Sequence, residues 1–170
     1  MEKNTSVQDR RMCKSECLCY NLCRRRYRMN PYMHRVQYYE TDMMGIAHHA
    51  NYIHWMEEAR IDFLDRLGFP YAAMEAAGVI SPVKAVSCEY KNSCTFGDRI
   101  TVAISVESFN GVVLALRYRM RKEQGELVCE ARSEHVFLNR EGRFVRLKRE
   151  LPGFCEAIEK EISEGAGSHE

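Results

Sequence analysis

The spacing of apolar residues predicts one long amphipathic helix over residues 51–67. Apolar side chains recur there at intervals of three and four residues, which places them on one helical face. That face holds Tyr52, Trp55, Met56, Ala59, Phe63 and Leu67. The charged residues between them, Arg60 among them, are expected mostly to face water. Gly68 is placed to end this helix, and a second, short helix is predicted over residues 70–77.

From residue 79 onward the pattern changes to a two-residue alternation or to short apolar runs, which are typical of strands. Together with an earlier run, this predicts strands over residues 34–39, 79–90, 99–109, 112–122, 127–138 and 143–147. Asn110-Gly111 joins two of them and is a strong signal for a tight hairpin. A short final helix is expected to begin at Pro152. Consecutive hairpins favour an antiparallel sheet of about five strands with the long helix on one face, an α+β fold.

Composition indicates one globular domain, which we expect to occupy residues 31–165. The chain has 170 residues, of which 45% are hydrophobic and 29% charged, as in ordinary soluble proteins. Charges interrupt every apolar run before it reaches the ~18 residues that a membrane-spanning helix needs. The net charge of +1 argues against a dedicated nucleic-acid binder. No export signal is recognised, so a cytoplasmic location is expected.

Residues 1–30 differ from the rest of the chain. They hold eight Lys and Arg residues against three Asp and Glu, and four of the eight cysteines: Cys13, Cys17, Cys19 and Cys23. Four thiols could hold zinc, but their spacing does not match the usual paired knuckles. We expect instead a leader that is disordered or that precedes the natural start of the chain, with Met29 as the natural first residue.

Residues able to support chemistry are densest where the first strand joins the long helix. Asp42 lies in this connection, and Gly45 separates it from the helix start. The unpaired N–H groups at a helix start favour developing negative charge. A carboxylate beside them could activate water or attack directly while the N–H groups hold an oxyanion. The arrangement predicts acyl transfer to water, although Asp42 taken alone would be interpreted as a turn or capping residue.

Two separated motifs resemble the 4-hydroxybenzoyl-CoA thioesterase family, and within it the YbgC-like acyl-CoA thioesterases. The first is Y-x-E-T-D-x-M-G-x-x-x-H-x-N-Y over residues 38–52, followed by E-E-A-R over residues 57–60. The second is Y-x6-G-D over residues 90–98. The resemblance covers roughly residues 32–152. It implies the hotdog fold, an antiparallel sheet wrapped around one long helix, and hydrolysis of an acyl-CoA thioester to a free acid and CoA.

The same resemblance implies roles for single residues. Asp42 matches the catalytic carboxylate, acting as general base or as nucleophile. The backbone N–H of His49 matches the donor that polarises the thioester carbonyl. No metal or redox cofactor is expected, because water is the co-substrate. His48 and His49 as a metal pair are not favoured, because adjacent residues point in different directions.

Contacts with the acyl group are expected around this pair. Gly45 would let the loop backbone pass close to the thioester. His48 and Tyr52, beside the helix start, would line the acyl tunnel. Glu57, one helical turn or more inward, would shape the site or position water. Met43-Met44 stands where smaller or polar residues are common in the family, which puts the size of the acyl group in question.

Binding of CoA would require cations for its phosphate groups. The candidates by location are Lys91, Arg143, Arg146 and Lys148, and we select Lys91 and Arg146. The family also implies a homodimer or homotetramer that joins sheets edge to edge, with active sites at the dimer interface.

The sequence leaves two alternative functions open. One is a thioesterase that acts on acyl-carrier protein. The other is a non-catalytic hotdog module that binds acyl-CoA.

Overall fold

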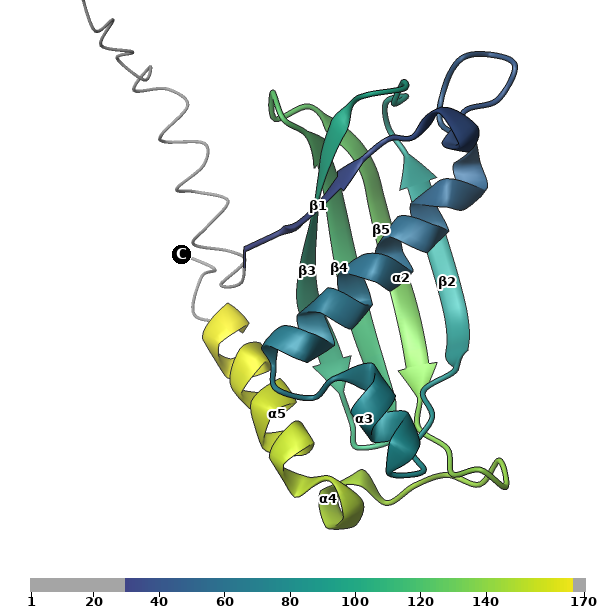
Figure 1. Ribbon diagram of the computed structural model, residues 1–170. Helices are drawn as coiled ribbons and strands as arrows, with labels where there is room; N and C mark the ends of the chain where they lie inside the picture. Colours follow the sequence, from purple (N-terminus) through teal and green to yellow (C-terminus); the bar gives the residue numbers. More distant parts are fainter. Residues whose placement is uncertain (1–29, 167–170) are drawn as a thin grey trace, which may run out of the picture.

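The computed structural model describes residues 30–166, and Figure 1 shows its arrangement. Five strands form one antiparallel sheet in the order β1-β3-β4-β5-β2. Their bounds are β1 Tyr32–Arg35, β2 Val83–Tyr90, β3 Arg99–Phe109, β4 Val113–Lys122 and β5 Leu127–Val136. The predicted antiparallel α+β architecture is confirmed. The leader, its zinc alternative and the start at Met29 fall outside the described residues.

One long helix, α2 (His49–Arg66), crosses a face of this sheet diagonally (Figure 1). The predicted apolar stripe is confirmed, since Trp55, Ala59 and Phe63 are buried along its inner face. Arg60 was expected to face water, but it is also buried. Its guanidinium lies over the ring of Tyr71 and is bonded to a carboxylate on its own helix.

Three shorter helices close the end of the sheet away from the start of α2 (Figure 1). They are α3 (Tyr71–Ala76), α4 (Leu147–Glu150) and α5 (Pro152–Ala166). Phe154 of α5 anchors this region, with its ring 5.4 Å from Phe69, 5.4 Å from Phe137 and 6.3 Å from Phe109. Edge-to-face aromatic contacts of this kind stabilise packing beyond the area they bury.

The predicted strand over residues 34–39 is wrong in its second half. β1 ends at Arg35, and Tyr38–Glu40 form a single 3-10 turn, η1. The reason is the carboxylate of Glu40, which turns back and accepts a 2.6 Å hydrogen bond from the backbone N–H of Gln37. Such a local bond competes with strand pairing.

Two further strand predictions need correction. The strand expected over residues 79–90 begins only at Val83, because Pro82 has no N–H to donate to a ladder. The strand expected over residues 143–147 is only an isolated bridge between Phe144 and Leu138. There the Oδ1 of Asn139 accepts the backbone N–H of residues 141 and 143, which holds the chain in a tight turn.

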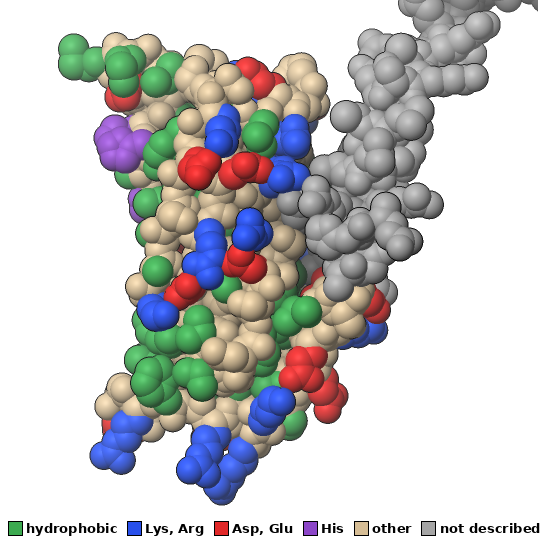
Figure 2. Space-filling view, turned by 180° about the vertical axis from the view of Figure 1, so that it is seen from behind, with side chains coloured by type: hydrophobic (Ala, Val, Ile, Leu, Met, Phe, Trp, Pro, Cys, Tyr) green, Lys and Arg blue, Asp and Glu red, His purple; other side chains and the backbone are tan. Residues whose placement is uncertain are grey.

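The face of the sheet away from α2 carries opposite charges on neighbouring strands (Figure 2). Glu107 on β3 pairs with Arg117 on β4 and with Arg132 on β5. Glu134 on β5 bonds Lys84 on β2 at 2.8 Å. Exposed pairs contribute only about 0–1 kcal/mol each. They identify this face as hydrated, while the fold is held by the core under α2.

Candidate active site

The chain between η1 and α2 forms a closed loop that carries Asp42. Thr41 and Ala47 pair across its base. The N–H of Asp42 donates to the carbonyl of Ile46 at 2.9 Å, and the N–H of Gly45 donates to the carbonyl of Asp42 at 2.9 Å. These bonds fix the loop, so Asp42 holds a defined position beside the start of α2.

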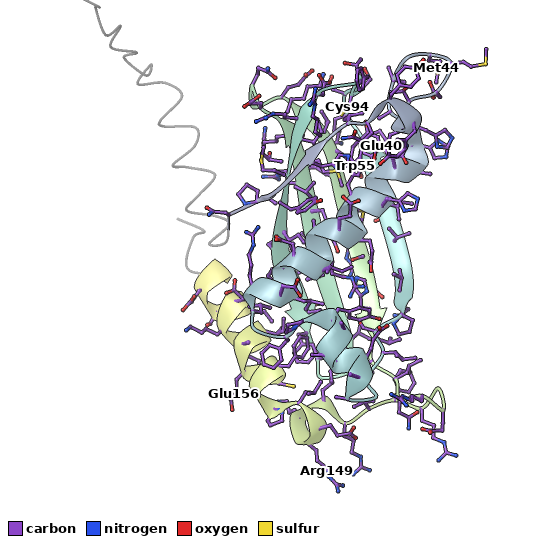
Figure 3. The ribbon with its side chains drawn as sticks, viewed as in Figure 1. Glu40, Met44, Trp55, Cys94, Arg149 and Glu156 are labelled. Atoms are coloured by element: carbon purple, nitrogen blue, oxygen red, sulfur yellow. The ribbon has the colours of Figure 1, made fainter. Side chains whose placement is uncertain are left out.

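Gly45 has a structural explanation within this loop. Its φ of +73° lies in the left-handed region that favours glycine, while a Cβ there would meet open space. The turn therefore requires glycine whether or not a thioester passes nearby. Met43 and Met44 at the tip of the loop are exposed, and Met44 points away from the body of the molecule (Figure 3).

The carboxylate of Asp42 is only partly used by the protein. Its Oδ1 accepts the N–H of Met44 at 2.8 Å, so the residue does form the turn that its type favours. Among residues 30–166, no group donates a hydrogen bond to its second oxygen. Asp42 is half-buried. The hydrogen bond at Oδ1 therefore holds the carboxylate in place, and Oδ2 is available to water or to a ligand.

The start of α2 supplies hydrogen-bond donors close in the chain to this carboxylate. The N-cap residue is His48, whose Nδ1 accepts the N–H of Ala50 at 3.3 Å. His49 is the first helical residue, and within the described part of the chain its N–H donates no hydrogen bond. The first N–H groups of a helix have no partner inside the helix, and the helix dipole makes them attract anions.

Aromatic side chains support the helix start from the sheet. The hydroxyl of Tyr90, the last residue of β2, donates to the carbonyl of His49 at 3.2 Å. Tyr52 lies between Tyr90 and Trp55, with ring centroids 5.1 Å and 4.6 Å away. Tyr52 is 3% exposed, and burial raises its pKa. Within one chain Tyr52 is a core residue, and its role in lining an acyl tunnel stays a prediction.

The remaining predicted site residues are separated from this group. Lys91 follows Tyr90 directly, so it lies at the same end of the sheet, where its Nζ bonds Glu89 at 2.6 Å. Glu57 is eight residues beyond His49 on α2, about 12 Å along the helix axis. Its carboxylate holds Arg60 at 2.5 and 3.0 Å.

Arg146 is the N-cap of α4. Arg149 and Met44 in Figure 3 mark the two opposite ends of the molecule, so Arg146 and Asp42 do not form one site within a chain. The chain brings together Asp42, Gly45, His48 and His49.

Sequence reasoning missed Glu40, a charged residue that is only 5% exposed. Its carboxylate accepts hydrogen bonds from the N–H of Gln37, from the indole of Trp55 at 2.8 Å and from the ring of His34 at 2.9 Å. Burial raises the pKa of Glu40, but these three donors outweigh it and leave the pKa below its usual value. Glu40 is therefore ionised. The only sequence signal was its place two residues before Asp42 in the first motif.

In residues 30–166, no three His, Cys, Asp or Glu side chains converge as metal ligands would. No helix in the same range is long and apolar enough to cross a membrane.

Residues 36–161 match the family described as the Thioesterase-like superfamily. The chain belongs to this superfamily. One relative in it is YneP of Bacillus subtilis, provisionally named an acyl-CoA thioesterase, which is 36% identical over 126 residues covering 74% of this chain and 91% of its own. The acyl-CoA thioester hydrolase YbgC of Escherichia coli is 29% identical over 97 residues, 57% of this chain and 72% of its own.

A solved structure shows the same architecture. The DHNA-CoA thioesterase of Staphylococcus aureus superposes with a TM-score of 0.79 and 32% identity, covering 83% of this chain and 95% of that chain. The predicted hotdog fold and the resemblance to YbgC-like thioesterases are confirmed.

Proposed function

We propose that this protein is an enzyme that hydrolyses acyl-CoA thioesters to a free carboxylic acid and CoA. The observation that carries the proposal is Asp42 on a fixed loop beside the N–H groups that begin α2, with one oxygen that no group of residues 30–166 hydrogen-bonds. The names of its relatives in the Thioesterase-like superfamily support the same reaction.

In this reaction Asp42 acts as general base or as nucleophile. As a base, it takes a proton from water while the water oxygen attacks the thioester carbonyl carbon. The carbonyl oxygen becomes an oxyanion, which the N–H of His49 and the helix dipole stabilise. The C–S bond then breaks, CoA leaves as a thiolate, and the proton held by Asp42 returns to the sulfur. As a nucleophile, a carboxylate oxygen of Asp42 would attack the carbonyl carbon, the C–S bond would break and CoA would leave as a thiolate. Water would then hydrolyse the anhydride to the free acid and the Asp42 carboxylate, and the released proton would pass to the thiolate.

We also propose that two copies pair through β2 to complete the site. Both β1 and β2 are edges of the sheet, but β1 has four residues and β2 has eight. Seven of the eight residues of β2 are exposed, including the apolar Val83, Val86 and Tyr90. A long exposed edge of this kind favours pairing with another strand. A partner subunit would bring further groups toward Asp42, since Glu57 and Arg146 of the same chain lie away from it.

The cytoplasm is the location we propose. The four described cysteines, Cys88, Cys94, Cys129 and Cys155, are free thiols, as expected in a reducing compartment.

The decisive experiment is thiol release from a panel of aliphatic and aromatic acyl-CoAs by wild type and Asp42→Asn. Asparagine keeps an oxygen that can accept the N–H of Met44, so the loop is expected to fold unchanged. Loss of a general base typically costs ~10²–10⁴ in rate, and we expect kcat to fall by that factor. The matched control is Asp65→Asn, an exposed position on α2, which should keep wild-type kcat.

Unchanged turnover in Asp42→Asn would contradict the proposed mechanism. Release from acyl-carrier protein but not from CoA would favour the first alternative. Binding of acyl-CoA without turnover on any substrate would favour the non-catalytic module.

A further inference from the structure

Glu40 joins three elements at the point where the candidate site begins. Its carboxylate is bonded to His34 on β1, to the N–H of Gln37 before η1 and to Trp55 on α2. Its backbone carbonyl accepts the N–H of His48 at 2.8 Å and the Nδ2 of Asn51 at 2.7 Å. The side chain and the backbone carbonyl of Glu40 therefore both bond to the first two turns of α2 and its N-cap.

The same residue also fixes the loop that carries Asp42. Glu40 ends η1, and Asp42 follows two residues later. The bond from the His48 N–H to the Glu40 carbonyl closes the loop from its other side. Any movement of Glu40 would displace Asp42 and the N–H of His49 relative to each other.

His34 lies between two carboxylates. Its Nε2 is 2.9 Å from Oε2 of Glu40, and its Nδ1 is 3.3 Å from Oε2 of Glu58. A neutral imidazole has one N–H, whereas an imidazolium has two. Only the charged ring carries an N–H on both nitrogens: Nε2 hydrogen-bonds Glu40, while Nδ1 faces Glu58 at ion-pair distance. The ring of Trp55 lies 4.8 Å away and tilted by 30°, so its face also favours a cation at this position.

The surroundings of His34 are mostly acidic or neutral. On β3 the residue opposite it is the apolar Ile100. Tyr32 on its own strand donates to Glu58 at 3.0 Å, and burial together with this bond raises the pKa of Tyr32 to about 12, so it stays a donor. Glu40 and Glu58 are the charged groups that contact His34, and Asp62 is a further carboxylate that acts on the neighbouring Tyr32.

We propose that Glu40 is a positioning residue for thioester hydrolysis, and that His34, as an imidazolium between Glu40 and Glu58, holds it in place. The inference rests on the proposed function for its effect on turnover. A neutral ring in place of the imidazolium would lose its charge attraction to both carboxylates and loosen the junction.

Two variants test the proposal through kcat and KM. In Glu40→Gln an NH2 group replaces one carboxylate oxygen, so one of the three donors around it faces another donor. We expect kcat to fall about 10- to 100-fold, because small displacements of reacting groups have effects of this size. KM should stay within about threefold, since Glu40 does not touch the substrate. His34→Gln should lower kcat as well, because the neutral amide lacks the charge that faces the carboxylates of Glu40 and Glu58. Glu107→Gln, a matched loss of charge on the opposite face of the sheet, should leave kcat and KM unchanged.

A second measurement is independent of turnover. Long-range ¹H–¹⁵N NMR spectra of the full chain distinguish an imidazolium from a neutral ring, and His34→Gln identifies the His34 signal. We expect the imidazolium pattern at pH 7 in wild type and a shift of the His49 amide in Glu40→Gln. A neutral His34 ring would overturn the proposal, as would wild-type kcat in both variants.

The two proposals fail in different ways. If wild type releases thiol from no substrate, the proposed function fails. The positioning role of Glu40 is then tested by the NMR signals of the His34 ring and of the His49 amide alone. If Glu40→Gln does not fold, His34→Gln and the half-exposed Glu58→Gln carry the test.

Discussion

Two groups of buried polar side chains lie under α2, and they are built in opposite ways. The Glu40 cluster, made of Glu40 with His34, Gln37, Asn51 and Trp55, lies under the first turns of the helix. The His135 cluster, made of His135 with Ser133, Tyr118 and the Arg60–Glu57 pair, lies under its middle. The first is complete in its hydrogen bonds, and the second is not.

In the His135 cluster a short chain of hydrogen bonds ends without a partner. The hydroxyl of Tyr118 lies 2.9 Å from Oγ of Ser133, which lies 2.7 Å from Nε2 of His135. Within residues 30–166, the Nδ1 of His135 has no hydrogen-bond partner although the residue is 1% exposed. Arg60 is nearly as buried and is balanced by a carboxylate whose side chain is 44% exposed.

This difference in hydrogen bonding shows where the fold requires a single arrangement of side chains. A fully bonded buried network specifies a single arrangement, while an unpaired buried group costs about 1–3 kcal/mol. The complete network contains Glu40, which lies two residues before Asp42 and bonds the start of α2. The incomplete one lies further along the helix, where the chain tolerates that cost.

The largest effect we expect is an acid sensitivity that comes from His135. Burial, and then the charge of Arg60, lower its pKa from 6.5 to about 4. The unfolded chain binds this proton below pH 6.5 and the folded protein does not until about pH 4, so the free energy of unfolding falls as the pH is lowered between these values. At 1.36 kcal/mol per pKa unit, the loss is about 3 kcal/mol.

Urea unfolding of wild type and His135→Leu at several pH values between 7 and 4 measures this effect. The difference between the two proteins isolates the contribution of His135 from those of the other titrating groups. Parallel pH dependence in both proteins would rule out a neutral, buried His135.

An intermediate effect is expected when the Arg60–Glu57 pair is broken from one side. Glu57→Ala leaves a buried guanidinium without its carboxylate. Breaking a buried pair in this way costs roughly 3–5 kcal/mol. We expect about 2 kcal/mol here, because Glu57 is half-exposed and water already screens the pair.

The matched variant is Arg60→Met, which removes the buried charge and keeps most of the volume. Its cost should be below about 1 kcal/mol, since the half-exposed Glu57 can be hydrated. Denaturation midpoints at pH 7 compare the two. Equal losses would mean that the pair, rather than the buried charge, determines stability.

A smaller loss than that of Glu57→Ala is expected in the Glu40 cluster. Asn51→Ala removes one of two donors to the carbonyl of Glu40, and His48 still satisfies that carbonyl. The loss should be about 1 kcal/mol, the usual value for one hydrogen bond. Thermal unfolding measures it. A loss of stability larger than that of Glu57→Ala would mean that the N–H of His48 alone does not satisfy the carbonyl of Glu40.

Much of the fold could be predicted because periodicity records which apolar positions face the core. The stripe from Tyr52 to Phe63 and the hairpin at Asn110-Gly111 were both visible in this way. Asp42 and His49 could be proposed as neighbours because a short loop joins them. Periodicity contains no information on a polar residue whose burial depends on distant partners. Glu40 is buried because Trp55 and His34 supply donors, and Arg60 because Tyr71 supplies a ring face, so both were missed.

The position of Trp55 has a practical consequence. It is the only tryptophan in the chain, it is fully buried, and it contacts both His34 and Glu40. Indole emission depends on local polarity and is quenched by a protonated imidazole. Intrinsic fluorescence of the unmodified protein is therefore a single-site optical probe of the junction that holds Asp42, readable in real time without a label.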